Sequence, residues 1–224
     1  MSGNEELIIV SARIKFPVMV FVTIIGFAFN LALGQTNEKT NIPQQTLLLT
    51  AEKYLDSIRS LQASFIQSST TGAVANGTLF IDRPGKLRIQ YKKPVTLQVY
   101  ANDTWLYYID YDLKEISQIP VDKTPASFLL HNKFRFSREL DILNTTKSHG
   151  TLRIEIAMRD SAGGGSMTLI FSENIDAFLG WVIEDTQGVK TKISLMNAKI
   201  NLPIPKKLFI FSIPDWAFPA DPQD

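Results

Sequence analysis

The most constraining feature of this sequence is a run of alternating residues on either side of Pro84-Gly85. Between positions 77 and 91, apolar side chains occupy every second position before and after this pair: Leu79, Ile81, Leu87, Ile89 and Tyr91. A period of two is typical of β-strands with one buried face. Proline presets φ at about −65° and glycine tolerates a positive φ, so the pair suits a tight turn. The sequence therefore predicts an antiparallel hairpin, with Arg83 at the lip of its apolar face.

The same alternation continues along much of the chain, with turn residues between the segments. We predict strands over residues 63–67, 96–101, 105–109, 115–119, 151–158, 167–172, 179–185, 190–198 and 207–211. Strands at such regular spacing favour an antiparallel barrel or a strongly curved sheet. A sheet curled round its apolar face must fill its interior with side chains, a helix or a ligand.

Helical spacing is confined to short stretches. Apolar residues three and four apart predict an amphipathic helix over about residues 46–61, with Glu52 and Asp56 on its polar face. A short helix is expected after Thr124, which would be its N-cap with Pro125 in the first position. A second short helix is expected near residues 137–142.

The N-terminal region has the three-part pattern of a secretory signal peptide. Arg13 and Lys15 precede an apolar run from Phe16 to Leu33, and small residues then lead into a polar stretch that begins at Gln35. We expect residues 1–34 to be a signal peptide cleaved near Gly34, and residues 35–224 to form one domain. The alternative is an uncleaved anchor, because about 18–20 apolar residues can span a bilayer.

Composition and motifs exclude several classes of protein. The chain has no cysteine, which excludes disulfides, thiol nucleophiles and a lipidated N-terminal cysteine, and its formal charge of +1 argues against nucleic-acid binding. The two histidines, His131 and His149, stand in no metal-binding spacing, and the glycines at 163–165 lack the residues that follow in a phosphate-binding loop. There is no nucleophile-elbow motif. We expect no enzyme activity, no metal and no cofactor.

The block from Gly77 to Pro94, written G-x-L-x-[apolar]-x-R-P-x-x-[apolar]-R-x-x-Y-x-x-P, resembles the periplasmic outer-membrane lipoprotein carrier proteins, the LolA-like family. A helix followed by L-x-A-S-F-x-Q at 61–67 and the pattern Thr-Pro-x-x-x-Leu-Leu at 124–130 match the family as well. The resemblance covers about residues 44–215. The turn Asn102-Asp103 is a mild departure, since the family commonly has Asp-Gly there.

The resemblance implies a mainly β (α+β) fold, an incomplete and strongly curved antiparallel β-barrel with a lid of short helices over a hydrophobic cavity. It also implies a periplasmic chaperone that shelters acyl chains in this cavity while it carries acylated lipoproteins from the inner to the outer membrane. The partners would then be acylated lipoproteins, an inner-membrane lipoprotein-releasing ABC transporter and an outer-membrane receptor. We expect the protein to be a monomer.

Site residues are carried over by motif or by alternation. In the family, the arginine of the R-P motif fastens the barrel lip to the lid, a role that falls on Arg83; the alternative is a solvated arginine at a hairpin end. Leu87 stands where the family often has phenylalanine. The residues expected to line the cargo cavity are Phe65, Leu79, Ile81, Leu87, Ile89, Tyr91, Val99 and Phe128. For all of these, simple core packing is the alternative.

Two other functions remain open from the sequence. A sensor on the same scaffold would bind lipid or mislocalised lipoproteins and signal envelope stress. A hydrolase would need catalytic carboxylates or a serine that only folding brings together.

Overall fold

The computed structural model describes residues 43–124, 127–136, 140–158, 165–212 and 214–217. Within these residues, eleven strands form one antiparallel sheet in the order β6-β5-β4-β3-β2-β1-β11-β10-β9-β8-β7. The strands are β1 (Ser60–Ser69), β2 (Val74–Asp82), β3 (Lys86–Tyr91), β4 (Leu97–Ala101), β5 (Trp105–Asp110), β6 (Glu115–Pro120), β7 (Leu140–Ser148), β8 (Thr151–Met158), β9 (Ser166–Ser172), β10 (Phe178–Glu184) and β11 (Lys190–Ile200). The two outer strands, β6 and β7, stay unpaired with each other in the described part of the chain, so the sheet is curved but not closed.

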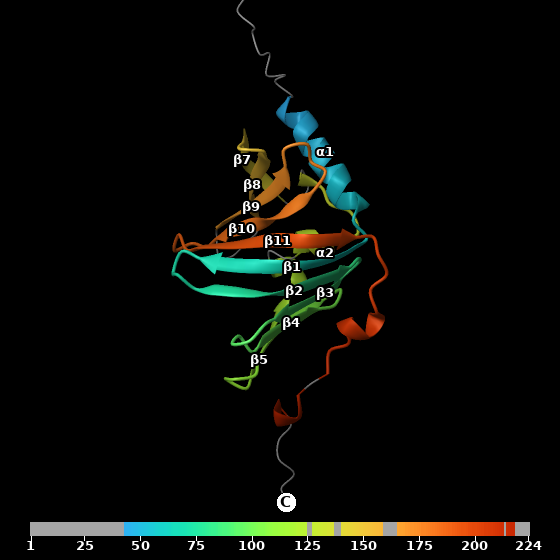
Figure 1. Cartoon of the computed structure of the whole chain (residues 1–224), viewed down its shortest axis with the longest axis vertical. Helices are drawn as coiled ribbons and strands as arrows, with labels where there is room; N and C mark the ends of the chain where they lie inside the picture. The colour runs from blue at the N-terminus through green and yellow to red at the C-terminus, as the bar shows by residue number, and fades with distance from the viewer. Residues whose placement is uncertain (1–42, 125–126, 137–139, 159–164, 213, 218–224) are drawn as a thin grey trace, which may run out of the picture. The chain divides into compact units, whose positions relative to one another are not determined.

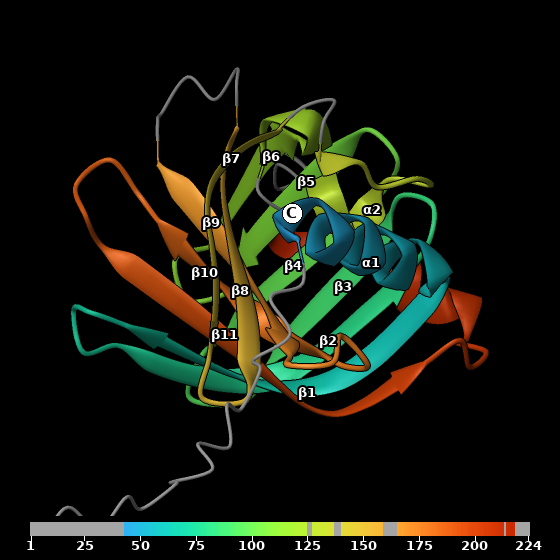
Figure 2. The same cartoon turned by 90° about the horizontal axis from the view of Figure 1, so that it is seen from above.

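The helices are few and short. They are α1 (Gln44–Ser57), α2 (Ser127–Leu130) and the 3-10 turns η1 (Val121–Lys123), η2 (Lys206–Phe209) and η3 (Asp215–Ala217). Figure 1 shows α1 running beside the edge of the sheet, and Figure 2 shows α1 and α2 on its concave side. The predicted mainly β fold, an incomplete and strongly curved antiparallel barrel with short helices, is confirmed.

The buried core lies between the concave face and these helices. From α1 it includes Ala51 and Leu55, and α2 contributes Phe128, Leu129 and Leu130. The alternation predicted for the central hairpin is present: Leu79 pairs with Ile89, and Ile81 pairs with Leu87. Phe65 is 3% exposed while its neighbour Ile66 is 43% exposed, so successive residues of β1 point to opposite faces.

The predicted helix over 46–61 is wrong at its C-terminal end, because α1 ends at Ser57 and Ile58 already has extended dihedrals. Asn201, at the end of β11, stops the helix: its side-chain amide donates to the Ser57 carbonyl at 2.9 Å and accepts from the Arg59 N–H at 2.7 Å. Leu61 fits the helical spacing but belongs to β1, where it pairs with Ile81 of β2. Sheet pairing therefore overrides the helical pattern there.

The segment from 137 to 142, predicted as helix, contains the start of a strand. Leu140, Asp141 and Ile142 begin β7 and pair with β8, while residues 137–139 lie outside the described residues. The turn after β7 is formed by His149 and Gly150, both at positive φ (49° and 72°), which suits a two-residue hairpin. The prediction therefore missed the strand that precedes this turn.

The strand predicted over 207–211 is also wrong, because Lys206–Phe209 form the 3-10 turn η2. The N–H of Leu208 donates to the carbonyl of Pro205, the N-cap of this turn, at 3.0 Å and not to a neighbouring strand. Residues 202–211, the C-terminal segment, instead pack on the convex face of the sheet. Phe211 stacks on Tyr107 with ring centroids 4.8 Å apart.

The short helix predicted after Thr124 is present as α2, but Thr124 has a different role. Its hydroxyl donates to the Val121 carbonyl at 2.8 Å and so completes the preceding turn η1. Pro125 lies outside the described residues.

Candidate functional site

Arg83 lies at the end of β2, beside the β2–β3 turn, and is 9% exposed. Its Nε donates to the carbonyl of Leu129 at 2.6 Å, its Nη1 to that of Leu55 at 2.6 Å, and its Nη2 to that of Phe128 at 3.5 Å. Burial lowers the pKa of Arg83 to about 10, which leaves the guanidinium charged at neutral pH. One side chain of the hairpin thus contacts both α1 and α2.

These acceptors are carbonyls at helix C-termini, which lack the usual donor four residues further along their own helix. The Leu55 carbonyl also accepts from the N–H of the C-cap residue Ile58 at 3.2 Å. The β2–β3 hairpin donates to three of the four backbone carbonyls of α2. Arg83 donates to the carbonyls of Phe128 and Leu129, and the Gly85 N–H donates to the carbonyl of Leu130 at 3.0 Å. The fourth, Ser127, accepts from the N–H of His131 at 3.1 Å. A cation there is further favoured by the negative end of the helix dipole. A helix as short as α2 is therefore held in place mainly by the β2–β3 hairpin.

Two carboxylates of α1 hold the residues that follow α2. Glu52 Oε1 accepts from the Phe136 N–H at 2.8 Å, and Asp56 Oδ1 accepts from the Phe134 N–H at 2.6 Å. The other oxygen of Asp56 pairs with Arg135. We call residues 127–136 the α2 segment. It is fastened at one end by Arg83 and at the other by the two carboxylates.

The Asp56 contacts predict a dependence of stability on acid. Partial burial opposes ionisation, but hydrogen bonds from Arg135 and Phe134 outweigh it and hold the pKa of Asp56 below its ordinary 3.8. A folded-state pKa below the unfolded one stabilises the fold above that ordinary value, and this contribution is lost as pH falls through the folded pKa. We expect urea midpoints of wild type and Asp56→Asn to converge as the pH falls below about 3.8. A midpoint difference that stays constant with pH would contradict this.

Aromatic rings of the α2 segment fill the concave side of the sheet. The ring centroid of Phe128 lies 6.1 Å from that of Phe134, 6.4 Å from that of Phe178 and 6.3 Å from that of Trp181. Phe134 in turn lies 4.7 Å from Phe136, edge to face. The interior that a ligand would occupy is thus partly taken by side chains from the α2 segment.

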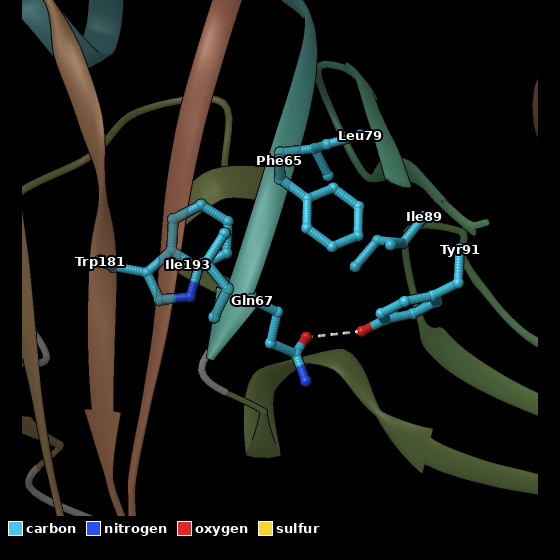
Figure 3. Close-up of a pocket in the computed structure, with 7 residues that line it drawn as sticks. All are labelled: Phe65, Gln67, Leu79, Ile89, Tyr91, Trp181 and Ile193. Carbon is cyan, nitrogen blue, oxygen red and sulfur yellow. Dashed lines mark hydrogen bonds between the residues drawn. The ribbon is translucent and has the colours of Figure 1, made fainter. Parts of the chain in front are cut away.

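A pocket with a cavity volume of about 20 Å³, open to solvent on one side, remains on the concave face beside these rings. It is lined by Phe65, Gln67, Leu79, Ile89, Tyr91, Trp181 and Ile193 (Figure 3). Phe65 and Tyr91 meet edge to face at 5.3 Å, and the Tyr91 hydroxyl donates to Gln67 Oε1 at 2.8 Å. The lining is apolar apart from this pair.

Four of the eight predicted cavity residues line this pocket: Phe65, Leu79, Ile89 and Tyr91. The other four, Ile81, Leu87, Val99 and Phe128, are buried in the adjoining core. Sequence reasoning missed Gln67, Trp181 and Ile193. Trp181 and Ile193 follow the alternation of strands that were predicted, but nothing in the sequence showed that β10 and β11 face β1 to β3 across one concavity.

In the described ranges, no group of three or more His, Cys, Asp or Glu side chains is placed to hold a metal ion. Nor do those ranges contain a helix that combines the length and the apolar character needed to cross a bilayer.

The sequence profile of the family described as "Outer membrane lipoprotein carrier protein LolA" matches residues 56–212 of this chain. The chain belongs to the LolA family. The match begins in the second half of α1 and ends after the C-terminal segment, so it includes Arg83, the α2 segment and the pocket. The family description is that of a carrier.

Individual proteins match the sequence of this chain at modest identity. The outer-membrane lipoprotein carrier protein of Methylococcus capsulatus is 28% identical over 193 residues, which cover 82% of this chain and 90% of that protein. The protein of the same name from Legionella pneumophila (strain Paris) is 27% identical over 76% of this chain and 87% of its own length. Among solved structures, a LolA superfamily protein from Nitrosomonas europaea aligns with a TM-score of 0.44 and 9% identity, over 73% of this chain and 97% of that one.

Proposed function

We propose that residues 35–224, after removal of a signal peptide, act in the periplasm as a lipoprotein chaperone. The chain would take acylated lipoproteins from an inner-membrane lipoprotein-releasing ABC transporter and deliver them to the outer membrane, with or without a receptor there. It would do so without enzymatic chemistry. The names of the family and of the two relatives support the class of cargo.

The observation that carries the proposal is the way in which the apolar interior is closed. The concave face is covered by the α2 segment, and hydrogen bonds fasten that segment at its two ends. Each buried methylene contributes about 0.8 kcal/mol, so an acyl chain leaves a membrane only for a site that is equally dry. A carrier therefore needs an interior that is apolar and a cover that can be released.

The size of the pocket indicates that the cover must move. Pockets that hold drug-sized ligands measure about 300–1,000 Å³, whereas the cavity volume here is about 20 Å³. The acyl chains of a lipoprotein need more room than this. We propose that Phe128 and its neighbours leave the interior when cargo enters, and that Arg83 sets the free energy of the closed state.

Binding to the acylated form of one lipoprotein tests the proposal. The purified 35–224 protein should keep a triacylated lipoprotein in the supernatant after centrifugation with liposomes. In gel filtration, the acylated lipoprotein should co-elute with the protein, whereas the same lipoprotein without acyl chains should not. Loaded protein should then transfer the cargo to outer-membrane vesicles. Sedimentation of all acylated lipoprotein with the liposomes would contradict the proposal. Stable binding without any transfer would favour the sensor instead.

A further inference from the structure

The pocket contains one hydrogen-bonded polar pair among apolar side chains. Figure 3 shows the dashed bond from the Tyr91 hydroxyl to the Gln67 side chain, with Phe65 and Ile89 beside the pair. Gln67 and Tyr91 come from β1 and β3, which are not neighbours in the sheet but are separated by β2. A polar pair in an otherwise apolar pocket is the arrangement that fixes the orientation of a ligand.

The sequence builds this pair through Gly77. Gly77 of β2 pairs with Phe65 on one side and with Tyr91 on the other. A Cβ at this position would lie 2.8 Å from the ring of Phe65. The missing side chain lets the rings of Phe65 and Tyr91 meet across β2, edge to face with an interplanar angle of 89°. Gln67, two residues beyond Phe65, lies on the same face of β1 and within reach of the Tyr91 hydroxyl.

The hydrogen bond from Tyr91 to the Gln67 oxygen leaves the nitrogen of the Gln67 amide available. The oxygen of Gln67 accepts from Tyr91, while its nitrogen donates to no protein atom among the described residues. In Figure 3 this nitrogen is turned away from Phe65 and Ile89. The Tyr91 hydroxyl donates to the oxygen of this amide at 2.8 Å, and burial raises the pKa of Tyr91 to about 12. The amide is thereby held with its N–H groups free to donate to a ligand.

We infer that the Gln67 amide, positioned by Tyr91, binds the carbonyl oxygen of an acyl ester or amide whose hydrocarbon tail lies among the apolar residues of the pocket. This inference rests on the proposed function and specifies the part of the cargo that is recognised. An ester carbonyl that enters a pocket loses its water, and a donor placed at the pocket restores a hydrogen bond. The site would thus distinguish acyl groups from plain hydrocarbon.

A matched pair of probes tests this inference. One is a fluorescent fatty-acid methyl ester, and the other is the same fluorescent chain ending in an alkyl group. The wild-type 35–224 protein should bind the ester about tenfold more tightly. Gln67→Met, which keeps the length of the side chain without its donors, should reduce this ratio to about one. Tyr91→Phe should reduce the ratio in part, because it removes the bond that orients the amide but not the amide.

The outcomes separate this inference from the proposed function. If both probes bind equally well to wild type, or if Gln67→Met weakens both by the same factor, the inference is wrong while the cavity function stands. If neither probe binds, both are wrong. Titrations of a triacylated lipopeptide and of a diacyl phospholipid identify which of these two ligands supplies the ester. The ligand that binds less tightly to Gln67→Met than to wild type is the ligand that uses this site.

Discussion

Replacing Arg83 with leucine is expected to free α2 from the sheet and to trap cargo in the open protein. The substitution leaves the carbonyls of Leu129 and Leu55 without the guanidinium that each contacts at 2.6 Å. Hydrogen bonds to charged groups contribute about 1.5–3 kcal/mol each, and leucine recovers part of this through apolar burial. We expect the closed state to lose about 2–4 kcal/mol.

This loss has opposite effects on stability and on cargo affinity. In the proposed function, cargo competes with the α2 segment for the same interior, so a weaker closed state would raise the ratio of loaded to closed protein. A loss of 2 kcal/mol corresponds to a rise of roughly 30-fold. Arg83→Leu should therefore unfold at lower urea, hold lipoprotein more tightly and deliver less of it to outer membranes. Hydrogen exchange at the His131 amide, which bonds to the Ser127 carbonyl in α2, should become faster.

Arg88→Leu is the matched control, since Arg88 lies on the same hairpin but on the convex face. Its Nη1 donates to the Leu208 carbonyl at 3.0 Å, and its guanidinium lies 4.8 Å from the ring centroid of Tyr100. This variant should loosen the C-terminal segment and leave His131 exchange and cargo affinity unchanged. Arg83→Lys keeps the charge but not the fork of donors, so it should fall between wild type and Arg83→Leu. If Arg83→Leu and Arg88→Leu behave alike, Arg83 has no special role in closing the interior.

Phe128→Ala should have the second large effect, because it removes the ring that fills the interior. Phe128 is 5% exposed and contacts three other aromatic side chains. Truncating a buried phenylalanine costs about 3–5 kcal/mol, and the cavity that remains is apolar. An apolar cavity of this kind stays dry and takes up apolar molecules. The variant should unfold at lower denaturant and yet bind more of a fluorescent apolar probe than wild type does.

Phe80→Ala provides the control, since Phe80 is 8% exposed and lies on β2 between the inward residues Leu79 and Ile81. It should lose stability without gaining probe binding. Denaturant titration and probe titration of the two variants separate the contributions. An unchanged probe affinity in Phe128→Ala would show that α2 does not occupy the ligand space.

The pattern of single strands was readable from the sequence, whereas contacts between distant elements were not. Alternation placed Leu79, Ile81, Leu87 and Ile89 correctly on one buried face. The acceptors of Arg83, however, are backbone carbonyls 28 and 46 residues away, and a carbonyl leaves no mark in a sequence. Only the resemblance to a family indicated that this arginine meets a helix.

The contacts of the α1 carboxylates were likewise not predictable from the sequence. On an amphipathic helix, Glu52 and Asp56 belong to the polar face, and helical spacing assigns such residues to solvent. In the structure they accept from backbone N–H groups 84 and 78 residues away. The end of α1 is likewise set by Asn201, 142 residues from Arg59. Local pattern predicts which face of an element is apolar, but it does not predict which distant backbone satisfies its polar groups.

Site-specific photo-crosslinking can locate the acyl chains, which we propose to lie on the concave face of the sheet. A photoreactive phenylalanine analogue replaces either Phe65, which lines the pocket, or the adjacent Ile66, which lies on the convex face. Each protein is loaded with a lipoprotein that carries radiolabelled acyl chains and is then irradiated. We expect a labelled adduct from position 65 and none from position 66, because only position 65 faces the pocket. Equal labelling at both positions, or labelling at position 66 alone, would contradict it.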